Sequence, residues 1–344
     1  MVNCFRVICC RSEGYEPSVE ILSGVAPKTE RPFAAKVEPE RVEVVPVTDP
    51  VQLGESPHWD SDEEALYFVS ILDKAIHRYK PSTGEHTKAT LEKPPTFIIP
   101  VEGKSRHFAV SQGRKAVEVM WDGGEEDALV LRTLAEVDHH RPENSLNGGK
   151  ADPRGRLFAG SVFGMKTSVP VDFHAGCGSL YRIDPDSQAY RLDDEVSLPN
   201  GLCWDVERNF FYFTDSLEYA IRRYDYDVET GNLSNCETVF RMKDHNLEGI
   251  CDGITIDTDG NIWAAIFEGE QILKIDPRSG QILQEVRLPV PQLTSLTFGG
   301  PNSDILYVTS ANTHKKNDNT LWGCTFKVTG LGVRGYPNLK VRFD

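Results

Sequence analysis

Four residues whose side chains carry oxygen donors occupy corresponding positions in a pattern that recurs along the chain. They are Glu55, Asn147, Asn200 and Asp252. Two carboxylates and two amide oxygens that converge on one point form a hard-oxygen site, which suits Ca²⁺, Mg²⁺ or Mn²⁺ and suits copper poorly. The set contains no Cys and no His, which argues against a zinc cage. Two carboxylates held close together would repel each other without a cation, so the set predicts a divalent metal site.

A simpler interpretation exists for three of these residues. Asn147, Asn200 and Asp252 are each followed by Gly, and Asn-Gly and Asp-Gly pairs are common in tight turns. Taken alone, each would be read as a turn residue. Their coincidence with Glu55 at one register in four repeat units favours the metal site.

The repeated pattern consists of four short β-rich segments joined by turns. The clearest unit begins at residue 200 with N-G-L-C-W-D, and continues with F-F-Y-F-T-D at 210–215 and A-I-R-R-Y-D-Y at 220–226. Units with the same order begin near residues 55, 147 and 252, and two weaker ones begin near residues 97 and 295. Repeats of roughly 40 to 50 residues with four strands each are typical of propeller blades.

Six such units predict an all-β protein, a six-bladed β-propeller with four-stranded blades and a central metal site. The innermost strand of each blade runs along the central channel, so equivalent residues of successive blades form a ring at one rim. A pair of packed sheets would not explain six copies of one register. Because closure protects the terminal sheet edges, we expect the strand at 41–47 to pair with the last unit.

The N-terminal region differs in composition from the repeats. Residues 11 to about 40 are rich in Glu, Pro, Ser and Lys and poor in aromatic residues, so they bury too little apolar surface to offset the entropy of ordering. We therefore expect a flexible N-terminal extension over residues 1–40 and the propeller over residues 41–344. The first ten residues do not read as a signal peptide, and acylation at Cys9 or Cys10 is the less favoured alternative to a disordered leader.

Composition limits the classes of partner. The formal charge of −15, from 52 acidic and 37 basic residues, argues against nucleic acid or an anionic membrane, which both require clustered cations. No apolar run is long enough for a transmembrane segment. The eight cysteines form no CxxC pair and no zinc spacing, which favours a reducing compartment, the cytoplasm, with Cys203, Cys251 and Cys324 as buried apolar side chains.

Other candidate motifs carry less chemistry. The segment 257–262 superficially resembles a calcium loop, but its Gly is at the fourth position instead of the sixth, so a turn between strands is the better interpretation. His58 is the one histidine close in sequence to a candidate ligand, Glu55, and could contact that ligand without binding the metal itself. The chain contains no nucleophile elbow, P-loop or dinucleotide-binding fingerprint.

Several motifs together resemble the regucalcin family, which is also called the senescence marker protein and gluconolactonase family. The chain is similar in particular to the insect regucalcin and luciferin-regenerating-enzyme-like proteins. The similarity covers about residues 50–344. The motifs are G-E-S-P-H-W at 54–59, L-N-G-G-K-A-D-P at 146–153, P-N-G-L at 199–202, D-G at 252–253, F-G-G-P at 298–301 and V-T-G-L-G-V at 328–333.

The resemblance implies site residues and a reaction. The family's metal ligands match Glu55, Asn200 and Asp252, and a further family Asn near the substrate matches Asn147. One divalent ion is implied, namely Ca, Mg, Mn or Zn, with Ca as the expected resident ion. The implied activity is that of a lactonase, in which the ion polarises the lactone carbonyl and lowers the pKa of the attacking water. Asp252 is then the proton acceptor.

One departure from the family pattern concerns the substrate. The family usually has an Arg two positions before the Asn of this motif and an Asp just after it, whereas this chain has Ser145 and Gly148. Arg offers a fork of donors that Ser cannot replace. The position of Ser145 still marks the expected substrate side of the site.

Three functions therefore stay open at the level of the sequence. The first is a metal-dependent hydrolase of a small lactone or ester, less polar than a sugar-acid lactone. The second is a non-catalytic calcium-binding regulatory protein of the regucalcin type, which Ser145 and Gly148 favour. The third is an activity like that of luciferin-regenerating enzyme, which no residue selects. The set of four rim residues favours the first function. We expect a small-molecule substrate, and the oligomeric state stays open.

Overall fold

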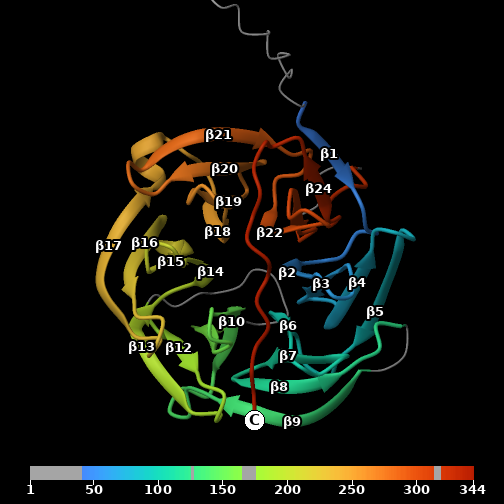
Figure 1. The fold of residues 1–344 in the computed structure, drawn as a ribbon, viewed down its shortest axis with the longest axis vertical. Helices are drawn as coiled ribbons and strands as arrows, with labels where there is room; N and C mark the ends of the chain where they lie inside the picture. Colours follow the sequence, from blue (N-terminus) through green and yellow to red (C-terminus); the bar gives the residue numbers. More distant parts are fainter. Residues whose placement is uncertain (1–40, 125–127, 165–175, 314–318) are drawn as a thin grey trace, which may run out of the picture. The chain divides into compact units, whose positions relative to one another are not determined.

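Six sheets of four strands surround a central channel in the computed structural model (Figure 1). The structure describes residues 41–124, 128–164, 176–313 and 319–344. Every blade is antiparallel, with its first strand at the channel and its last strand at the outer surface. The predicted six-bladed, four-stranded propeller is confirmed. The extension predicted over residues 1–40 lies outside the described residues.

The blades follow one another in chain order. Blade 1 consists of β2 (Gly54–Asp60), β3 (Ala65–Ser70), β4 (Ala75–Lys80) and β5 (Glu85–Thr90). Blade 2 consists of β6 (Ile98–Pro100), β7 (His107–Gln112), β8 (Lys115–Met120) and β9 (Leu129–Glu136). Blade 3 consists of β10 (Asn144–Ala151), β11 (Leu157–Phe163), β12 (Gly178–Ile183) and β13 (Ala189–Val196).

The second half repeats the plan. Blade 4 consists of β14 (Pro199–Asp205), β15 (Phe210–Asp215), β16 (Ala220–Tyr226) and β17 (Leu233–Arg241). Blade 5 consists of β18 (Ile250–Ile256), β19 (Ile262–Phe267), β20 (Gln271–Asp276) and β21 (Gln281–Arg287). Blade 6 contains β22 (Leu293–Gly299), β23 (Ile305–Ser310) and β24 (Phe326–Thr329). Two short 3-10 helices, η1 (Ser216–Glu218) and η2 (Met242–His245), flank β16 and β17.

The two ends of the propeller meet in blade 6. Strand β1 (Glu43–Pro46) pairs antiparallel with β24, with Val44 opposite Val328, and supplies the fourth strand of that blade. The predicted pairing of the 41–47 strand with the last unit is therefore confirmed. This pairing gives the outer edge of β24 a hydrogen-bonded neighbour.

Apolar side chains from facing sheets fill the spaces between blades. Between blades 5 and 6, Trp263, Phe298 and Phe326 belong to one buried cluster. Across the junction of blades 1 and 6, the rings of Trp59 and Tyr307 stack with centroids 5.5 Å apart. The outer strands, such as β13 and β17, are largely exposed. The core is thus a series of layers between blades, with the channel at its centre.

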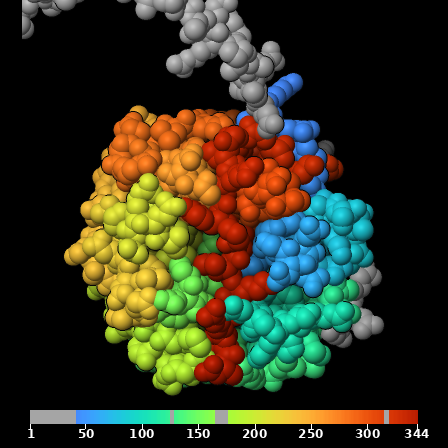
Figure 2. Space-filling model, in the orientation of Figure 1, coloured from blue at the N-terminus to red at the C-terminus, as the bar shows by residue number. Residues whose placement is uncertain are grey.

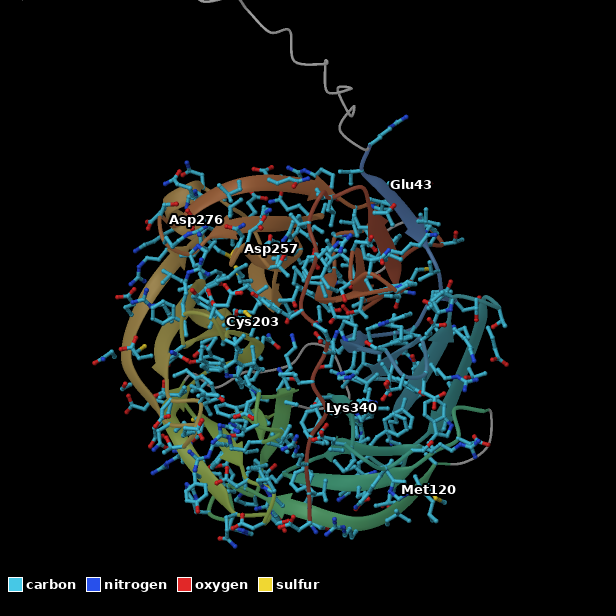
Figure 3. The ribbon with its side chains drawn as sticks, in the orientation of Figure 1. Glu43, Met120, Cys203, Asp257, Asp276 and Lys340 are labelled. Carbon is cyan, nitrogen blue, oxygen red and sulfur yellow. The ribbon has the colours of Figure 1, made fainter. Side chains whose placement is uncertain are left out.

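After β24 the chain crosses the face of the propeller, and we call residues 330–344 the C-terminal strap. Figures 1 and 2 show the strap, in red, lying over the middle of this face. Gly335 forms a bridge with Asp257 of blade 5, and Val341 forms a bridge with Val101 of blade 2. Lys340 pairs with Asp60 at 3.0 Å; Figure 3 labels Lys340 on the strap as it crosses the channel.

Two smaller expectations also agree with the structure. Asp257 begins the turn between β18 and β19, where its Oδ1 accepts hydrogen bonds from the backbone N–H groups of Asp259 and Asn261. Cys203, Cys251 and Cys324 are buried free thiols. Among the helices in the described ranges, none has the length and apolar character to cross a bilayer.

The stacked pair at the junction of blades 1 and 6 leads to a stability prediction. Trp59→Ala removes a side chain that is 3% exposed, and we expect it to lower the free energy of unfolding by about 3–5 kcal/mol. Urea denaturation measures the change. Leu283→Ala, on outer strand β21 and 53% exposed, serves as the control. Equal effects of the two variants would contradict the role of this junction.

Candidate metal centre

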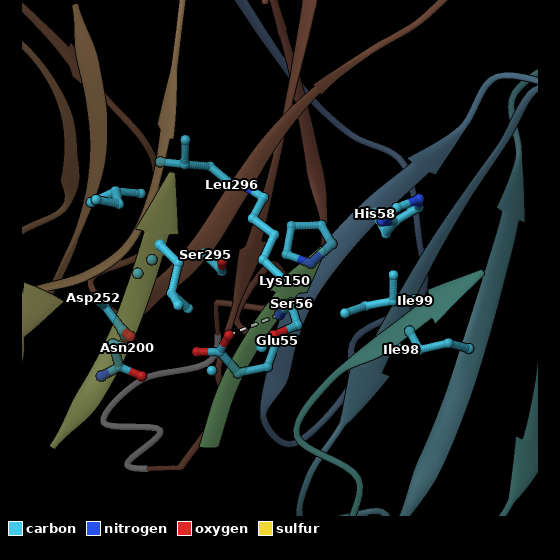
Figure 4. A pocket seen from close by; sticks show the side chains of 17 residues that line it. Glu55, Ser56, His58, Ile98, Ile99, Lys150, Asn200, Asp252, Ser295 and Leu296 are labelled. Atoms are coloured by element: carbon cyan, nitrogen blue, oxygen red, sulfur yellow. Dashed lines mark hydrogen bonds between the residues drawn. The ribbon is translucent and has the colours of Figure 1, made fainter. Parts of the chain in front are cut away.

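Glu55, Asn200 and Asp252 line one small pocket on the channel axis. They come from the inner strands β2, β14 and β18 of three blades. Figure 4 shows the three side chains close together at one end of the pocket. The cavity volume is about 40 Å³, which holds an ion or a few water molecules and no substrate. The rest of the wall includes apolar side chains, among them Ile98, Ile99, Leu202, Ile254 and Leu296.

Irregular strand pairing turns these side chains toward the channel. In five blades the register between the first and second strands shifts, at Glu55/His58, Asn147/Gly149, Pro199/Leu202, Cys251/Ile254 and Leu293/Leu296. Such bulges bend a strand and redirect its side chains. The β6–β7 pair of blade 2 is regular, and β6 contributes only Ile98 and Ile99 to the pocket.

The repeat register inferred from the sequence agrees with the strand pairing. The residue directly before each candidate pairs with the equivalent position of the second strand, namely Gly54 with Ser70, Leu146 with Ser161, Pro199 with Asp215 and Cys251 with Ile266. Only the start of the bulge differs. Glu55 and Asn147 are the last paired residues before the shift, whereas Asn200 and Asp252 lie within it. Ser56, directly after Glu55, has a φ of 47°. This left-handed residue lies in the bulge between Glu55 and His58.

The glycines that follow three of these residues have a role other than turn formation. Gly148, Gly201 and Gly253 lie within strands. A Cβ on Gly201 would lie 2.4 Å from the backbone nitrogen of Ile254, and one on Gly148 would lie 2.4 Å from the backbone oxygen of Asn200. Glycine is thus required because neighbouring inner strands approach too closely for any side chain, and the turn interpretation does not apply.

The two carboxyl groups are buried together. Burial raises the pKa of Glu55 from 4.5 to about 7, and the hydrogen bond from the Ser56 N–H to its Oε2, 2.8 Å long, lowers it only in part. Burial and, second, the charge of Glu55 raise the pKa of Asp252 well above its usual value. In the described part of the chain, Oδ1 of Asp252 has no hydrogen-bond partner.

A chain of hydrogen bonds orients the Asn200 side chain. Asn147 Nδ2 donates to Asn200 Oδ1 at 2.8 Å, and Asn200 Nδ2 donates to Ser216 Oγ at 2.8 Å. Ser216 Oγ then donates to the Cys251 carbonyl oxygen at 2.5 Å. The amide group is held at both ends, which fixes the position of its oxygen. Ser216 was not found from the sequence, since a Ser after the second strand of one blade has no counterpart in the other repeats.

The two residues assigned to the substrate lie outside the pocket lining. Asn147 is 6% exposed, and both hydrogens of its amide are used, one on Asn200 Oδ1 and the other on the Pro199 carbonyl oxygen at 2.8 Å. Ser145 lies two residues earlier on β10, opposite Val162. Most of the loop at 164–177, where the family has another substrate contact, falls outside the described residues.

The donors fit a hard divalent cation. Within the described ranges no three His, Cys, Asp or Glu side chains form a metal cluster, so the predicted set depends on two carboxylates and the amide oxygen of Asn200. The two buried carboxyl groups repel each other when both are ionised, and one of them has an oxygen without a partner. They therefore supply the oxygen ligands and negative charge that a hard divalent cation binds. The central metal itself stays a prediction.

Comparisons of the sequence and of the structure with known proteins point to the same family. Residues 53–312 match the model of the SMP-30/Gluconolactonase/LRE-like region. The chain is 38% identical over 291 residues to regucalcin of Danio rerio. This aligned region covers 83% of this chain and 93% of that protein. A solved luciferin-regenerating enzyme is 36% identical, with a TM-score of 0.82 over 88% of this chain and 100% of that one.

A more distant structure shares the fold. The calcium-binding protein regucalcin of Agrobacterium tumefaciens is 22% identical to this chain, with a TM-score of 0.74. The match covers 87% of this chain and 96% of that one.

The hydrogen-bond chain through Asn200 predicts a positioning role for Ser216. Ser216→Ala frees one end of the Asn200 amide, and we expect a roughly tenfold weaker affinity for Ca²⁺ or Mn²⁺. Isothermal titration calorimetry measures the affinity. Ser234→Ala, on the exposed face of β17, is the control. Unchanged affinity in Ser216→Ala would show that Asn200 does not depend on this hydrogen bond.

Proposed function

Because the chain belongs to the SMP-30/gluconolactonase/LRE-like family, we propose that it is a divalent-metal-dependent hydrolase of a small lactone or ester. One observation carries the proposal: Glu55 and Asp252 bury two carboxyl groups side by side on the channel axis, next to the oriented amide of Asn200. Without a cation this arrangement opposes the ionisation of both acids. The proposed ligands are Glu55, Asn200 and Asp252.

A bound divalent ion would supply Lewis-acid polarisation of the substrate carbonyl and a lower pKa for the attacking water. Asp252 has an oxygen that accepts no hydrogen bond from the described protein, so it is available to take the proton that the water releases. The water oxygen bonds to the carbonyl carbon and the C–O ester bond breaks. Asp252 then returns the proton to the leaving oxygen, and the product is a hydroxy acid.

The size of the pocket supports a substrate position outside it. A cavity of about 40 Å³ has room for the ion and water, so the lactone ring would bind outside it and present only its carbonyl group. The apolar wall around Ile98 and Leu296 limits the access of bulk water, which strengthens electrostatic interactions inside. A substrate with fewer hydroxyl groups than a sugar-acid lactone suits this wall and the Ser145 side of the site.

A calcium-binding protein without turnover is the second candidate function. It is favoured by the smaller number of donors on the substrate side, since Ser145 replaces an Arg and both amide hydrogens of Asn147 are used. The Asp that the family has at position 148 could not be introduced without moving Asn200, because a Cβ there meets the Asn200 carbonyl oxygen. The two candidates share the metal site and differ in turnover.

Turnover of a panel of lactones distinguishes the candidates. We expect metal-loaded wild-type protein to hydrolyse at least one lactone, and Asp252→Ala to lower kcat/KM by at least about 10²-fold because it removes a ligand and the proton acceptor. Asp259→Ala, in the exposed β18–β19 turn, is the control. If the wild type binds Ca²⁺ but hydrolyses no lactone in a metal-dependent manner, the enzyme proposal is wrong and the second candidate stands.

A second variant examines the substrate side. Ser145→Arg adds a fork of donors two residues before Asn147, and we expect kcat/KM for sugar-acid lactones to rise roughly tenfold. Kinetics on a sugar-acid lactone and on an apolar lactone should show the gain only for the first. No gain would mean that the substrate side differs from the family by more than this residue.

A further inference from the structure

A second cavity, of about 350 Å³, lies beneath the C-terminal strap. We call it the strap cavity. Its walls come from the inner strands β2, β10, β14 and β18 on one side and from strap residues 336–339 on the other. The side chains that matter below are His58, Lys150, Trp204, Ile256, Val206 and Leu339. None of them is among the proposed metal ligands.

The roof of the strap cavity is held to the blades at Asn338 and Lys340. Asn338 Nδ2 donates to the Phe298 carbonyl oxygen at 2.9 Å, and Asn338 Oδ1 accepts from Thr297 Oγ1 at 2.7 Å. Lys340 pairs with Asp60 of blade 1 at 3.0 Å. The cavity is therefore a fixed part of the fold, with the strap anchored to blades 6 and 1.

Most of the wall is apolar. Trp204 and Ile256 form part of the floor, and Val206 and Leu339 are each 41% exposed. Large apolar side chains left this exposed around a concave site favour an apolar ligand.

The wall of the strap cavity also contains one cationic side chain, Lys150. Lys150, on β10, lines the strap cavity and also the metal pocket. Among the residues that the structure describes, no carboxylate lies within ion-pair distance of its ammonium group. Burial raises the pKa of the nearby Cys203 thiol to about 12, so the thiol stays neutral and supplies no anion. Burial also lowers the pKa of Lys150, which is the expected cost of a cation without a partner.

Two buried polar groups on the same wall also lack partners. Trp204, 6% exposed, has an Nε1–H without a hydrogen-bond acceptor in the described structure, and His58, 4% exposed, has an unpartnered Nε2. Burial lowers the pKa of His58 to about 3, so its ring is neutral. Buried polar groups normally have partners, and a ligand oxygen could supply them here.

We propose that the strap cavity binds a small apolar carboxylic acid, whose carboxylate pairs with Lys150 and whose apolar body packs against Trp204, Ile256 and Leu339. The pocket of Glu55 and Asp252 and the strap cavity carry opposite charges, so they select different ligands. The metal pocket presents carboxylates and suits a cation, whereas the strap cavity presents an unpaired cation and suits an anion. An apolar acid meets both requirements of the wall, and a neutral molecule of the same shape meets only one.

The experiment is a calorimetric titration of the full-length protein with 3-phenylpropionate. A chelator is present throughout, so that no metal ion can hold the carboxylate. The neutral analogue 3-phenylpropan-1-ol has the same apolar body. We expect saturable binding of the acid with one site per chain, and at least about tenfold weaker binding of the alcohol.

Two variants locate the site. Lys150→Met keeps most of the apolar stem and removes the charge, and Val206→Glu places a negative charge at the exposed rim. Both should weaken binding of the acid by at least about tenfold. Lys327→Met, on β24 of blade 6, is the matched control and should bind as the wild type does. Circular dichroism melting confirms that each variant is folded.

Several results would overturn the proposal. They are the absence of saturable binding by the wild type, equal affinity for the acid and the alcohol, and wild-type affinity in folded Val206→Glu and Lys150→Met. Since no metal and no turnover enter the measurement, its outcome is independent of the proposed hydrolase activity.

Discussion

The close approach of inner strands around one axis is the constraint on which the site depends. Five of these strands carry bulges where they face the channel, and neighbouring backbones come so near that positions such as 201 and 253 accept only glycine. The same proximity brings Glu55 and Asp252 together from blades 1 and 5. A pair of like charges out of water is unfavourable, so the geometry that closes the ring also creates the demand for a cation.

The channel has a different chemical character at its two ends. Near Glu55, Asn200 and Asp252 it offers oxygen atoms and negative charge, while beneath the strap it offers Lys150 and an apolar wall. Lys150 lines both cavities, so the two ends are electrostatically connected through one side chain. Figure 3 shows Cys203, next to this lysine, beside the channel and near the strap.

The repeats made most of the fold predictable. Their spacing indicated the six blades, and the need to close the ring indicated the pairing of β1 with β24. The oxygen-bearing residues could be selected because the same register recurred in four units. The bulge begins after Glu55 and Asn147 but one residue earlier, before Asn200 and Asp252, in the other two blades. A bulge inserts an unpaired residue without any mark in the local composition, so its exact position could not be predicted.

Other features depend on contacts that no repeat encodes. Ser216 orients Asn200 from η1, and within the described ranges no other blade has such an element after its second strand. The strap has no equivalent in the other blades, and its path is fixed by single contacts such as Lys340 with Asp60 and Asn338 with Phe298. Long-range contacts of this kind are decided by the assembled surface, so the sequence pattern did not predict them.

The pairing of β1 with β24 has a consequence for biosynthesis. On the ribosome β1 emerges before the other strands and β24 after them, so the ring stays open until β24 has been made. Blades 1 to 5 can form in turn from local hairpins, but β1 has no partner throughout this time, and its free edge is a template for wrong pairing. Nascent chains therefore depend on rapid completion of blade 6, and C-terminal truncation would leave the first strand permanently unpaired.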